Sequence, residues 1–469
     1  MHYRLLLLLL LLWRPALADE PDDLIAVLDG IRRDAGVAAM AVVRVDAEGW
    51  VDYQVRGLRD WQTRNAVSER DYFRIGSVSK LFVGMAALIA QQQGALSLDR
   101  PLREWLQGEW YDNPWEQSAP LTLAHLLEHT AGWHDMSRRE FDHNDPRPAS
   151  LVEALHLAPA SRRSQWPPGR HSEYSNSGAG LAALAISQAV EVDFESYVKH
   201  RIFEPLGMNS ATYRLEQRVS ERLVRGYDRD GRTAIPYWHI LYRPAGGINL
   251  VPRDMAPLLQ MLLRRGRHGE SRFLSEAQVQ RLQHPRTTLA ARHGLDYGYG
   301  LGIYQSQHRG HSLFGHGGDA DGYLAHLSYS PAAGRGYFIV ITAFNHAPLR
   351  KMKRRLNDWL VADLKTPEKP PLATTAELQR LVGEYQQAAT RFARPGWRQQ
   401  RLRVALRGSG LVTIDQEGDE RPLLAVDQWR FRRPWETTAT AIFIAAEDGG
   451  MILQGGMGNW RRPAAAETD

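Results

Sequence analysis

The stretch YFRIGSVSK (residues 72–80) places Ser77 and Lys80 three residues apart at the predicted start of a helix. Residues 81–92 repeat apolar side chains at helical spacing, and Gly94 ends that pattern. Side chains three positions apart lie on one helical face. A buried lysine can lose its proton and then activate a serine hydroxyl, because desolvation and nearby positive charge favour the neutral amine. Ser77 and Lys80 are therefore a candidate nucleophile and base, although S-x-x-K also occurs by chance in long chains.

A second stretch, WPPGRHSEYSNSGAG (residues 166–180), places Tyr174 and Asn176 in a Pro/Gly-rich loop before a predicted helix. A tyrosine hydroxyl can pass a proton between nucleophile and leaving group if a cation keeps its pKa low. An asparagine amide can orient a substrate carbonyl. The alternative is a helix cap formed by Ser175 or Asn176.

A third stretch, LFGHGGDADGYLAHLSYSP (residues 313–331), carries His316, Gly317 and Gly318 in a predicted loop just before a strand. Paired glycines permit a ligand to approach the backbone closely. A histidine beside glycines can equally be an ordinary turn residue, so this stretch alone does not identify a site.

Taken in order, the three stretches resemble the signature of the penicillin-recognising serine hydrolases, a family of class C β-lactamases, DD-peptidases, D-aminopeptidases and esterases. HLLEHTAGW (residues 125–133), FEPLGMNSATY (203–213) and PAGGINLVPRDM (244–255) are similar to further landmarks of that family. The resemblance covers about residues 23–364. It implies an α/β fold: a mixed antiparallel sheet flanked by helices, with an all-α subdomain.

The resemblance also implies roles for these residues and a two-step acyl transfer without metal or organic cofactor. Ser77 would be the acylated nucleophile, Lys80 its base and Tyr174 the proton relay to the leaving group. Substrate would be bound by Asn176, His316, Gly317 and Gly318. The oxyanion hole would be formed by the backbone NH groups of Ser77 and Asp319.

Two departures from the family pattern bear on the substrate. His316 stands where many relatives have lysine, so we expect a weaker, pH-dependent positive charge there. Asp319 and Asp321 follow at once, and acidic side chains at the mouth of the site should repel a substrate carboxylate. The pattern favours a small-molecule or peptide amide or ester, as in the D-aminopeptidase and esterase branches. A DD-peptidase or β-lactamase acting on peptidoglycan or penicillins, and an inactive envelope-binding scaffold, are the alternatives.

Two other motifs indicate different chemistry. HLLEH (residues 125–129) matches an inverted zinc-peptidase pattern, in which His125, Glu128 and His129 would serve a metal, but Gly132 ends the helix soon afterwards. GYGLGIYQ (residues 298–305) resembles a nucleotide-binding glycine loop only superficially, and backbone crowding in a sheet explains it better.

The first 20 residues, MHYRLLLLLLLLWRPALADE, have a basic start, an apolar block and a small-x-small site. We expect a signal peptide over residues 1–18, cleaved after Ala18, and a periplasmic or secreted bacterial protein with no transmembrane segment. A membrane anchor is the alternative. The chain has no cysteine, which excludes disulfides and a lipid-modified N-terminal cysteine. Its net charge of +5 is too small to indicate nucleic-acid binding.

The 469 residues are enough for one large domain and one smaller domain. We predict strands over residues 37–45, 49–58, 297–306, 323–331 and 336–344 and a helix over 349–364, so that one sheet forms from both ends of a domain spanning residues 19–364. A proline-rich linker covers 365–373. Alternating apolar and polar residues then predict a small β-barrel, lipocalin-like, or a sandwich over 374–463. Residues 464–469 form a tail.

Overall fold

The computed structural model describes residues 21–141, 143, 147–369, 378–392, 399–408 and 410–464. The predicted signal peptide (residues 1–18), residues 370–373 of the predicted linker and residues 465–469 of the tail lie outside the described residues. Within the described ranges, no helix combines the length and the apolar content that crossing a bilayer requires.

One six-stranded sheet forms the centre of the N-terminal part, in the order β2-β1-β12-β11-β10-β9. Every neighbouring pair in it is antiparallel. Its strands come from both ends of this part, as the sequence predicts: β1 (Ala39–Asp46), β2 (Val51–Gly57), β9 (Tyr304–His308), β10 (His311–Ala320), β11 (Tyr323–Ser330) and β12 (Arg335–Ile341). The side chains of β1 alternate between two cores, since Val43 and Met40 belong to different apolar clusters.

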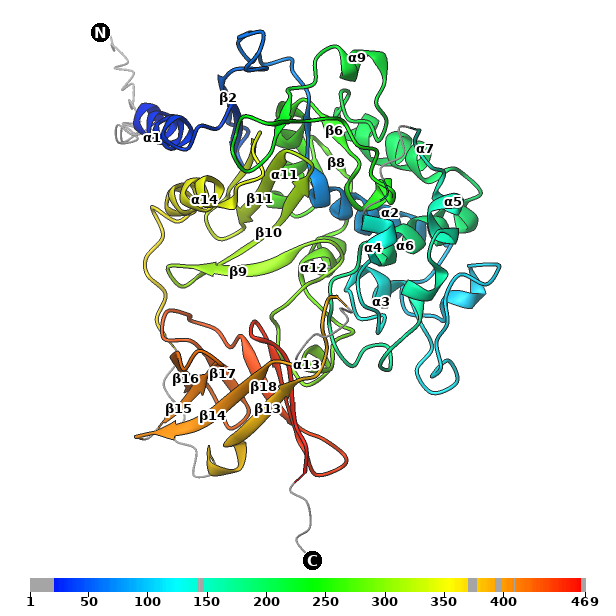
Figure 1. The fold of residues 1–469 in the computed structure, drawn as a ribbon, viewed down its shortest axis with the longest axis vertical. Coiled ribbons are helices and arrows are strands. Elements are labelled where there is room, and N and C mark those ends of the chain that lie inside the picture. Colours follow the sequence, from blue (N-terminus) through cyan, green and yellow to red (C-terminus); the bar gives the residue numbers. More distant parts are fainter. Residues whose placement is uncertain are drawn as a thin grey trace, which may run out of the picture.

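Helices cover both faces of this sheet (Figure 1). On one face lie α1 (Pro21–Asp34) and α14 (His346–Leu360), which bury Leu28 and Met352 against the strands. On the other face, α11 (Met255–Leu263) packs against β1 and β12. The predicted helix near the end of this part is therefore confirmed.

Most of the remaining helices of the N-terminal part lie together beside the sheet, whereas α13 (Leu289–Arg292) lies next to the C-terminal barrel (Figure 1). Two of them are central, α2 (Lys80–Gln92) and α6 (Asn176–Val190), which pack against each other. The smaller helices are α3 (Leu123–Leu127), α4 (Arg138–Phe141), α5 (Leu151–His156), α7 (Phe194–Val198), α8 (Glu204–Leu206), α9 (Gln217–Ser220), α10 (Arg243–Gly246), α12 (Glu276–Gln283) and α13 (Leu289–Arg292). Short strand pairs connect these helices: β3 (Phe73–Arg74) with β6 (Asn249–Leu250), β4 (Gly226–Tyr227) with β5 (Ala234–Ile235), and β7 (Arg267–His268) with β8 (Ser271–Arg272).

The C-terminal strands close into an eight-stranded antiparallel barrel, which lies at the bottom of Figure 1. They are β13 (Gly383–Gln387), β14 (Arg401–Arg407), β15 (Gly410–Ile414), β16 (Glu420–Ala425), β17 (Arg430–Arg432), β18 (Ala441–Ala445), β19 (Met451–Gly455) and β20 (Gly458–Arg462). Alternate residues such as Phe431, Phe443 and Leu453 fill the interior. Of the two predicted forms, a barrel or a sandwich, the structure has the barrel.

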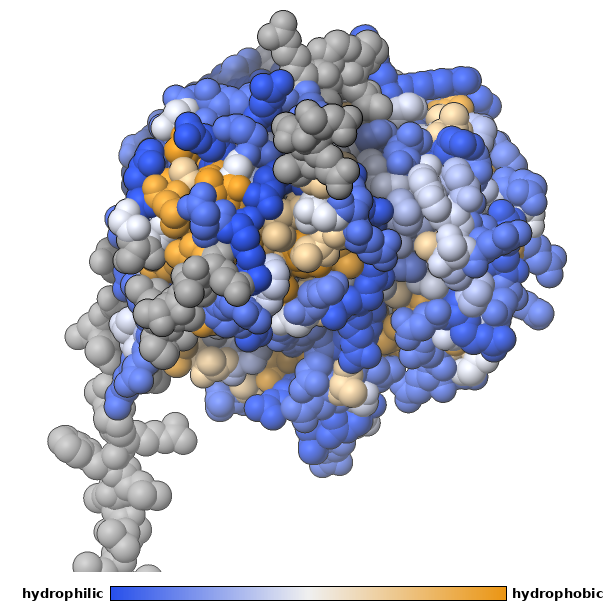
Figure 2. All heavy atoms as spheres, turned by 90° about the horizontal axis from the view of Figure 1, so that it is seen from below, coloured by the Kyte–Doolittle hydropathy of each residue, from blue (hydrophilic) through white to orange (hydrophobic). Residues whose placement is uncertain are grey.

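The barrel is docked onto the N-terminal part by apolar and polar contacts. Ala290 and Leu295 pack with Ile442, Ile444 and Ile452 of the barrel. Seen from the barrel end, the molecule is mostly hydrophilic, with apolar side chains gathered in a few patches between charged ones (Figure 2).

The sequence prediction for the HGG stretch is wrong in one respect. His316, Gly317 and Gly318 lie inside β10 and pair with residues 325–327 of β11, instead of forming a loop before a strand. Glycine disfavours strands by intrinsic preference, and here the long pairing with β11 outweighs that preference.

Candidate active site

Ser77 and Lys80 lie at the junction between a 3-10 turn, Gly76–Ser79, and α2. Ser77 is partly exposed, whereas Lys80 is 2% exposed. The distance between Lys80 Nζ and Ser77 Oγ is 3.1 Å. The structure therefore brings the predicted pair within hydrogen-bonding distance.

Three oxygen atoms surround the Lys80 amine. Besides Ser77 Oγ, they are Asn176 Oδ1 at 2.7 Å and the carbonyl oxygen of Ala245 in α10 at 2.8 Å. The latter two can only accept hydrogen bonds, so each takes one N–H of the amine. A neutral amine then has its lone pair left for the hydroxyl proton of Ser77.

Burial also favours that neutral amine. It is the main cause that lowers the pKa of Lys80 to about 7, assisted by the positive charge of Arg391 and opposed by the negative charge of Asp135. A large fraction of Lys80 is therefore unprotonated near neutral pH.

Asn176 begins α6, and Ser175 caps that helix by accepting a hydrogen bond from the NH of Gly178. The Nδ2 atom of Asn176 donates to both carboxylate oxygens of Asp135, at 3.2 and 3.0 Å. Because a carboxylate only accepts, this contact fixes the amide with Oδ1 toward Lys80. Ser175 thus forms the helix cap that was the alternative interpretation, and its neighbour Asn176 contacts Lys80.

Tyr174 lies beside both members of the Ser77–Lys80 pair. Lys80 Nζ lies 4.7 Å from the centre of its ring, and its hydroxyl is close enough to Ser77 to affect the pKa of Tyr174. The condition of a low pKa is not met at Tyr174: Arg391 acts in that direction, but burial is the larger effect and raises the pKa of Tyr174 above its ordinary value. Tyr174 is therefore a protonated phenol.

The HGG stretch of β10 lies directly against the turn Gly76–Ser79, called the serine turn below. Pairing between β10 and β9 ends at Gly315, so the following residues of β10 are not paired with β9. Backbones approach so closely there that a Cβ on Gly318 would lie 1.9 Å from the carbonyl oxygen of Ile75 and 3.2 Å from the nitrogen of Ser77. Likewise, a Cβ on Gly76 would lie 2.7 Å from the nitrogen of Asp319. The amides of Ser77 and Asp319 thus belong to two segments in direct contact.

His316 does not supply the expected pH-dependent positive charge. It is 3% exposed, and burial lowers its pKa to about 3, so the ring is neutral at ordinary pH. Its Nδ1 contacts the carbonyl oxygen of Gly317, which only accepts, so Nδ1 carries the proton. Its Nε2, 2.7 Å from the Tyr299 hydroxyl, then accepts from that tyrosine.

The two predicted acidic residues differ in their surroundings. Asp319 is exposed, and its carboxylate lies 3.6 Å from Nε2 of His346. Asp321 is half-buried, which raises its pKa, while the positive charge of Arg74 opposes that shift. Asp319 therefore keeps the exposed acidic character that the sequence predicts at this strand, whereas Asp321 is partly shielded.

The zinc alternative is not supported, because its three side chains serve other contacts. The ring of His125 takes part in the cap at Thr122. Glu128 pairs with Arg281 at 2.5 Å. His129 has a positive φ of 60° and packs between Tyr174 and Tyr299, at ring-centroid distances of 4.3 and 4.4 Å. Among the described residues, no group of three or more His, Cys, Asp or Glu side chains is arranged to hold a metal ion.

Several residues of the site were missed by sequence reasoning: Asp135, Ala245, Tyr299 and Arg391. Two had a signal, since Asp135 follows the HLLEHTAGW landmark and Ala245 lies in the PAGG landmark. Tyr299 belongs to the GYGLGIYQ stretch. The expected backbone crowding is present in that stretch, but against helices: a Cβ on Gly300 would lie 2.3 Å from the carbonyl oxygen of Leu282 in α12. Arg391 had no signal in the sequence.

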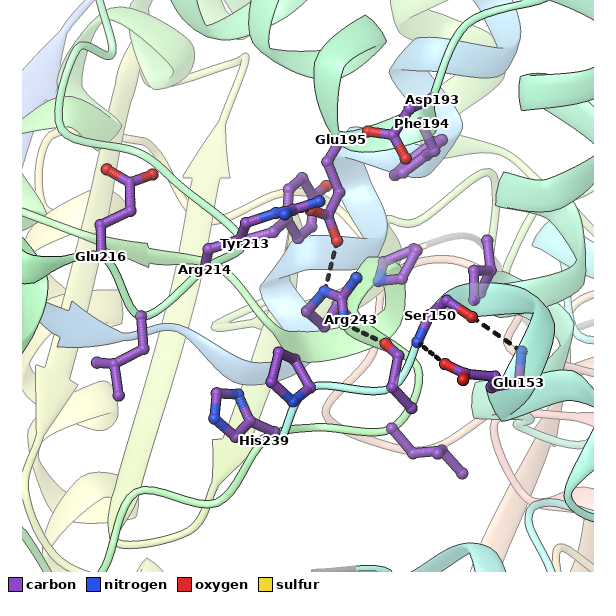
Figure 3. Close-up of a pocket in the computed structure, with 16 residues that line it drawn as sticks. Ser150, Glu153, Asp193, Phe194, Glu195, Tyr213, Arg214, Glu216, His239 and Arg243 are labelled. Carbon is purple, nitrogen blue, oxygen red and sulfur yellow. Dashed lines mark hydrogen bonds and ion pairs between the residues drawn. The ribbon is translucent and has the colours of Figure 1, made fainter. Parts of the chain in front are cut away.

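A pocket of about 650 Å³ lies on another side of α10. It contains an ion pair of 2.5 Å between Glu195 and Arg243, which point toward each other in Figure 3. Its lining includes Pro244 but neither Ser77 nor Lys80, so it is distinct from the serine site.

Residues 23–362 match the model of the protein family described as Beta-lactamase. A β-lactamase of Yersinia enterocolitica is 28% identical over 226 residues, which is 48% of this chain and 55% of that protein. The chain thus spans about half the length of such curated relatives.

Solved structures show the same fold. The octameric penicillin-binding protein homologue from Pyrococcus abyssi has a TM-score of 0.62 and 20% identity, with 94% of this chain and 99% of that chain covered. The D-amino acid amidase from Ochrobactrum anthropi SV3 in complex with L-phenylalanine amide has a TM-score of 0.59 and 21% identity, with 71% and 98% covered. The match to the Pyrococcus abyssi protein covers 94% of this chain and therefore includes the C-terminal barrel.

Proposed function

We propose that this chain, which belongs to the beta-lactamase family, is a serine hydrolase that cleaves an amide or ester through an acyl-serine intermediate on Ser77. The observation that carries this proposal is the distance of 3.1 Å between Lys80 Nζ and Ser77 Oγ, at an amine whose two other neighbours are acceptors, so that a neutral amine has its lone pair left for Ser77.

In the first step, Lys80 takes the hydroxyl proton of Ser77 while Oγ forms a bond to the substrate carbonyl carbon. Arginine could not take this proton, since its guanidinium stays charged. The negative charge that develops on the carbonyl oxygen is stabilised by the backbone NH groups of Ser77 and Asp319, which the contact of Gly318 with the serine turn supports. The start of α2 favours the same charge.

Tyr174 then delivers a proton to the leaving nitrogen or oxygen, and the bond between that atom and the carbonyl carbon breaks. Tyr174 is protonated, so it holds the proton that this step needs, and the proton held on Lys80 can restore the phenol afterwards. In the second step, water attacks the acyl-serine, and the Ser77 hydroxyl is regenerated.

We further propose that the acyl side of the substrate carries no nearby carboxylate. His316 is neutral, and Asp319 is exposed beside the proposed oxyanion hole, so the charge at this strand does not favour an anion. Asn176, Gly317 and Gly318 would contact the substrate amide. D-Amino-acid amides or peptides, including peptidoglycan-derived ones, and simple esters fit this description. The D-amino acid amidase of the same fold agrees with it.

The test is a substrate panel assayed with the wild type and Ser77→Ala. We expect hydrolysis of D-alanine p-nitroanilide or p-nitrophenyl esters, and labelling of Ser77 by a fluorophosphonate, with both lost in Ser77→Ala. Lys80→Arg, which keeps the charge, should be inactive as well. Turnover of nitrocefin or D-Ala-D-Ala peptides far above the others would replace the proposed substrate class with a β-lactamase or DD-peptidase. A wild type without any labelling would favour the inactive scaffold.

We propose that residues 1–18 direct export and that the protein acts in the periplasm or outside the cell, where peptidoglycan fragments occur. N-terminal sequencing of protein from a periplasmic fraction should begin at Asp19. Intact N-termini in the cytoplasm would contradict export.

A further inference from the structure

A loop of the C-terminal barrel reaches the serine site. It follows β13 and forms backbone contacts with residues 134 and 135 of the N-terminal part. The carbonyl oxygen of Arg391 accepts from the NH of Asp135 at 2.6 Å, and that of Thr390 contacts Nδ1 of His134 at 2.6 Å. A segment 256 positions away in sequence is thereby fixed next to Asp135.

The side chain of Arg391 holds the carboxylate of Asp135. Its Nε and Nη2 atoms donate to Asp135 Oδ2 at 2.9 and 2.7 Å. The Asp135 side chain is fully buried, while that of Arg391 is 41% exposed. A buried carboxylate needs such a partner, because an unpaired charge in the interior is strongly unfavourable.

Asp135 is in turn the residue that fixes Asn176. It accepts from the backbone NH of Asn176 at 2.7 Å and from its side-chain amide. That amide directs its oxygen to Lys80, as described above. A continuous series of hydrogen bonds therefore runs from the barrel to the nucleophile, through Arg391, Asp135, Asn176 and Lys80.

We propose that Arg391 is a positioning residue for the hydrolase reaction: the barrel supplies a guanidinium that fixes Asp135 and, through Asn176, holds the Lys80 amine directed at Ser77. This rests on the proposed function of Lys80 as base. The barrel is then a required part of the active site.

The charges around Lys80 support this assignment. Asp135, from the loop after α3, attracts the protonated amine and raises the pKa of Lys80, and Arg391 offsets that effect. The other titratable groups that face the amine are His129, His316 and Tyr174. All three are uncharged near neutral pH, because burial lowers the pKa of both histidines and raises that of the tyrosine. Among the described residues, Arg391 is thus the cation that counteracts the effect of Asp135 on Lys80.

Loss of Arg391 should not release the barrel, since other contacts hold it. Gln454 donates to the carbonyl oxygen of Arg170 at 2.6 Å, and Asn459 donates to that of Ser172 at 2.9 Å. The apolar cluster around Ile442 adds to them. An effect of Arg391 on Lys80 is therefore separable from docking.

The experiment compares the full-length wild type with Arg391→Gln, Arg391→Lys and the control Arg407→Gln. Arg407 is an exposed barrel arginine paired with Glu420, and it is not among the partners of Asp135 or Lys80 described above. The pKa of Lys80 is read directly from ¹³C-lysine NMR titration, since the chain has few lysines: Lys80, Lys199, Lys351, Lys353, Lys365 and Lys369. Lys80→Arg assigns the signal.

In Arg391→Gln we expect the pKa of Lys80 to rise by about one pH unit. The rate of Ser77 labelling should then fall about tenfold near pH 6 and much less near pH 9. Arg391→Lys should stay close to the wild type, because it keeps the charge, and so should Arg407→Gln. An unchanged Lys80 titration in Arg391→Gln, or an equal shift in Arg407→Gln, would overturn the proposal. A shifted titration in a protein whose Ser77 is never labelled would instead refute the proposed function and leave the effect of Arg391 on Lys80 standing.

Discussion

At the scale of single residues, the decisive feature is the protonation state of Lys80. Two effects on the pKa of Lys80 oppose each other. Burial favours the neutral amine, and the negative charge of Asp135 favours the charged one. Burial is the larger effect, so the amine is poised near neutral pH, where a general base works best. The neighbouring histidines do not share this property, because burial lowers the pKa of His316 to about 3.

This balance predicts the pH dependence of hydrolysis. Because Lys80 must be neutral to act, kcat/KM should rise about tenfold per pH unit below a midpoint near the pKa of about 7, and level off above it. Burial raises the pKa of Tyr174, so no loss of activity from its ionisation should appear on the alkaline side below about pH 10. Stopped-flow or plate assays of p-nitrophenyl ester cleavage over a pH series measure this curve.

His316→Asn is the control for that curve. A neutral His316 cannot create the midpoint, so the variant should keep it even where the overall rate falls. Disappearance of the acidic limb in His316→Asn would assign the titration to the histidine instead.

At the scale of elements, the site depends on how closely β10 approaches the serine turn. Residue 318 has no room for a side chain, because the carbonyl oxygen of Ile75 occupies the position of a Cβ. Gly317 differs, since the nearest atom to a Cβ there is the Tyr304 hydroxyl at 3.6 Å, an ordinary contact. Packing therefore requires glycine at position 318 but leaves room for a Cβ at position 317.

Gly318→Ala should push β10 and the serine turn apart. We expect a loss of about 1–3 kcal/mol in the free energy of unfolding and about a hundredfold slower labelling of Ser77, since a displacement near 1 Å can have that effect. Gly317→Ala should lose less than about 1 kcal/mol. Urea denaturation and labelling kinetics measure both quantities, and equal destabilisation by the two substitutions would contradict the argument.

At the scale of the whole molecule, the barrel and the N-terminal part share buried polar contacts. Gln454 is 2% exposed; besides its bond to Arg170, it accepts from the NH of Ala290 at 3.0 Å and contacts Nδ1 of His171. These contacts hold residues 170–173, which lead directly into Tyr174. Domain docking and the geometry of the site are therefore linked.

Gln454→Ala should destabilise the protein by about 1–3 kcal/mol, because it leaves buried donors and acceptors without partners. Gln416→Ala, at an exposed position of the same barrel, should change stability by less than about 0.5 kcal/mol. Thermal and urea unfolding of both variants provide the measurement. Equal stability of the two variants would show that the interface around Gln454 contributes little.

Patterns that are local in the chain were sufficient to predict the main helices, several strands and the residue types of the site. Apolar periodicity identified α2 and α14, alternation identified β14, β15, β18 and β19 of the barrel, and the spacing of Ser77 and Lys80 identified a pair that meets within one helical turn. These features depend on neighbours in the chain, so local pattern was sufficient. The same local reasoning placed the HGG stretch in a loop, because its strand is stabilised by pairing with β11.

The protonation state of His316 and the contact between Arg391 and Asp135 could be known only from the three-dimensional structure. The neutral state of His316 depends on burial by Tyr299 and other groups that no local pattern places around it. Arg391 approaches Asp135 across 256 positions of sequence, and the barrel must close and dock before that contact exists. Burial and long-range electrostatics are properties of the assembled molecule, and they set the protonation state on which the proposed chemistry depends.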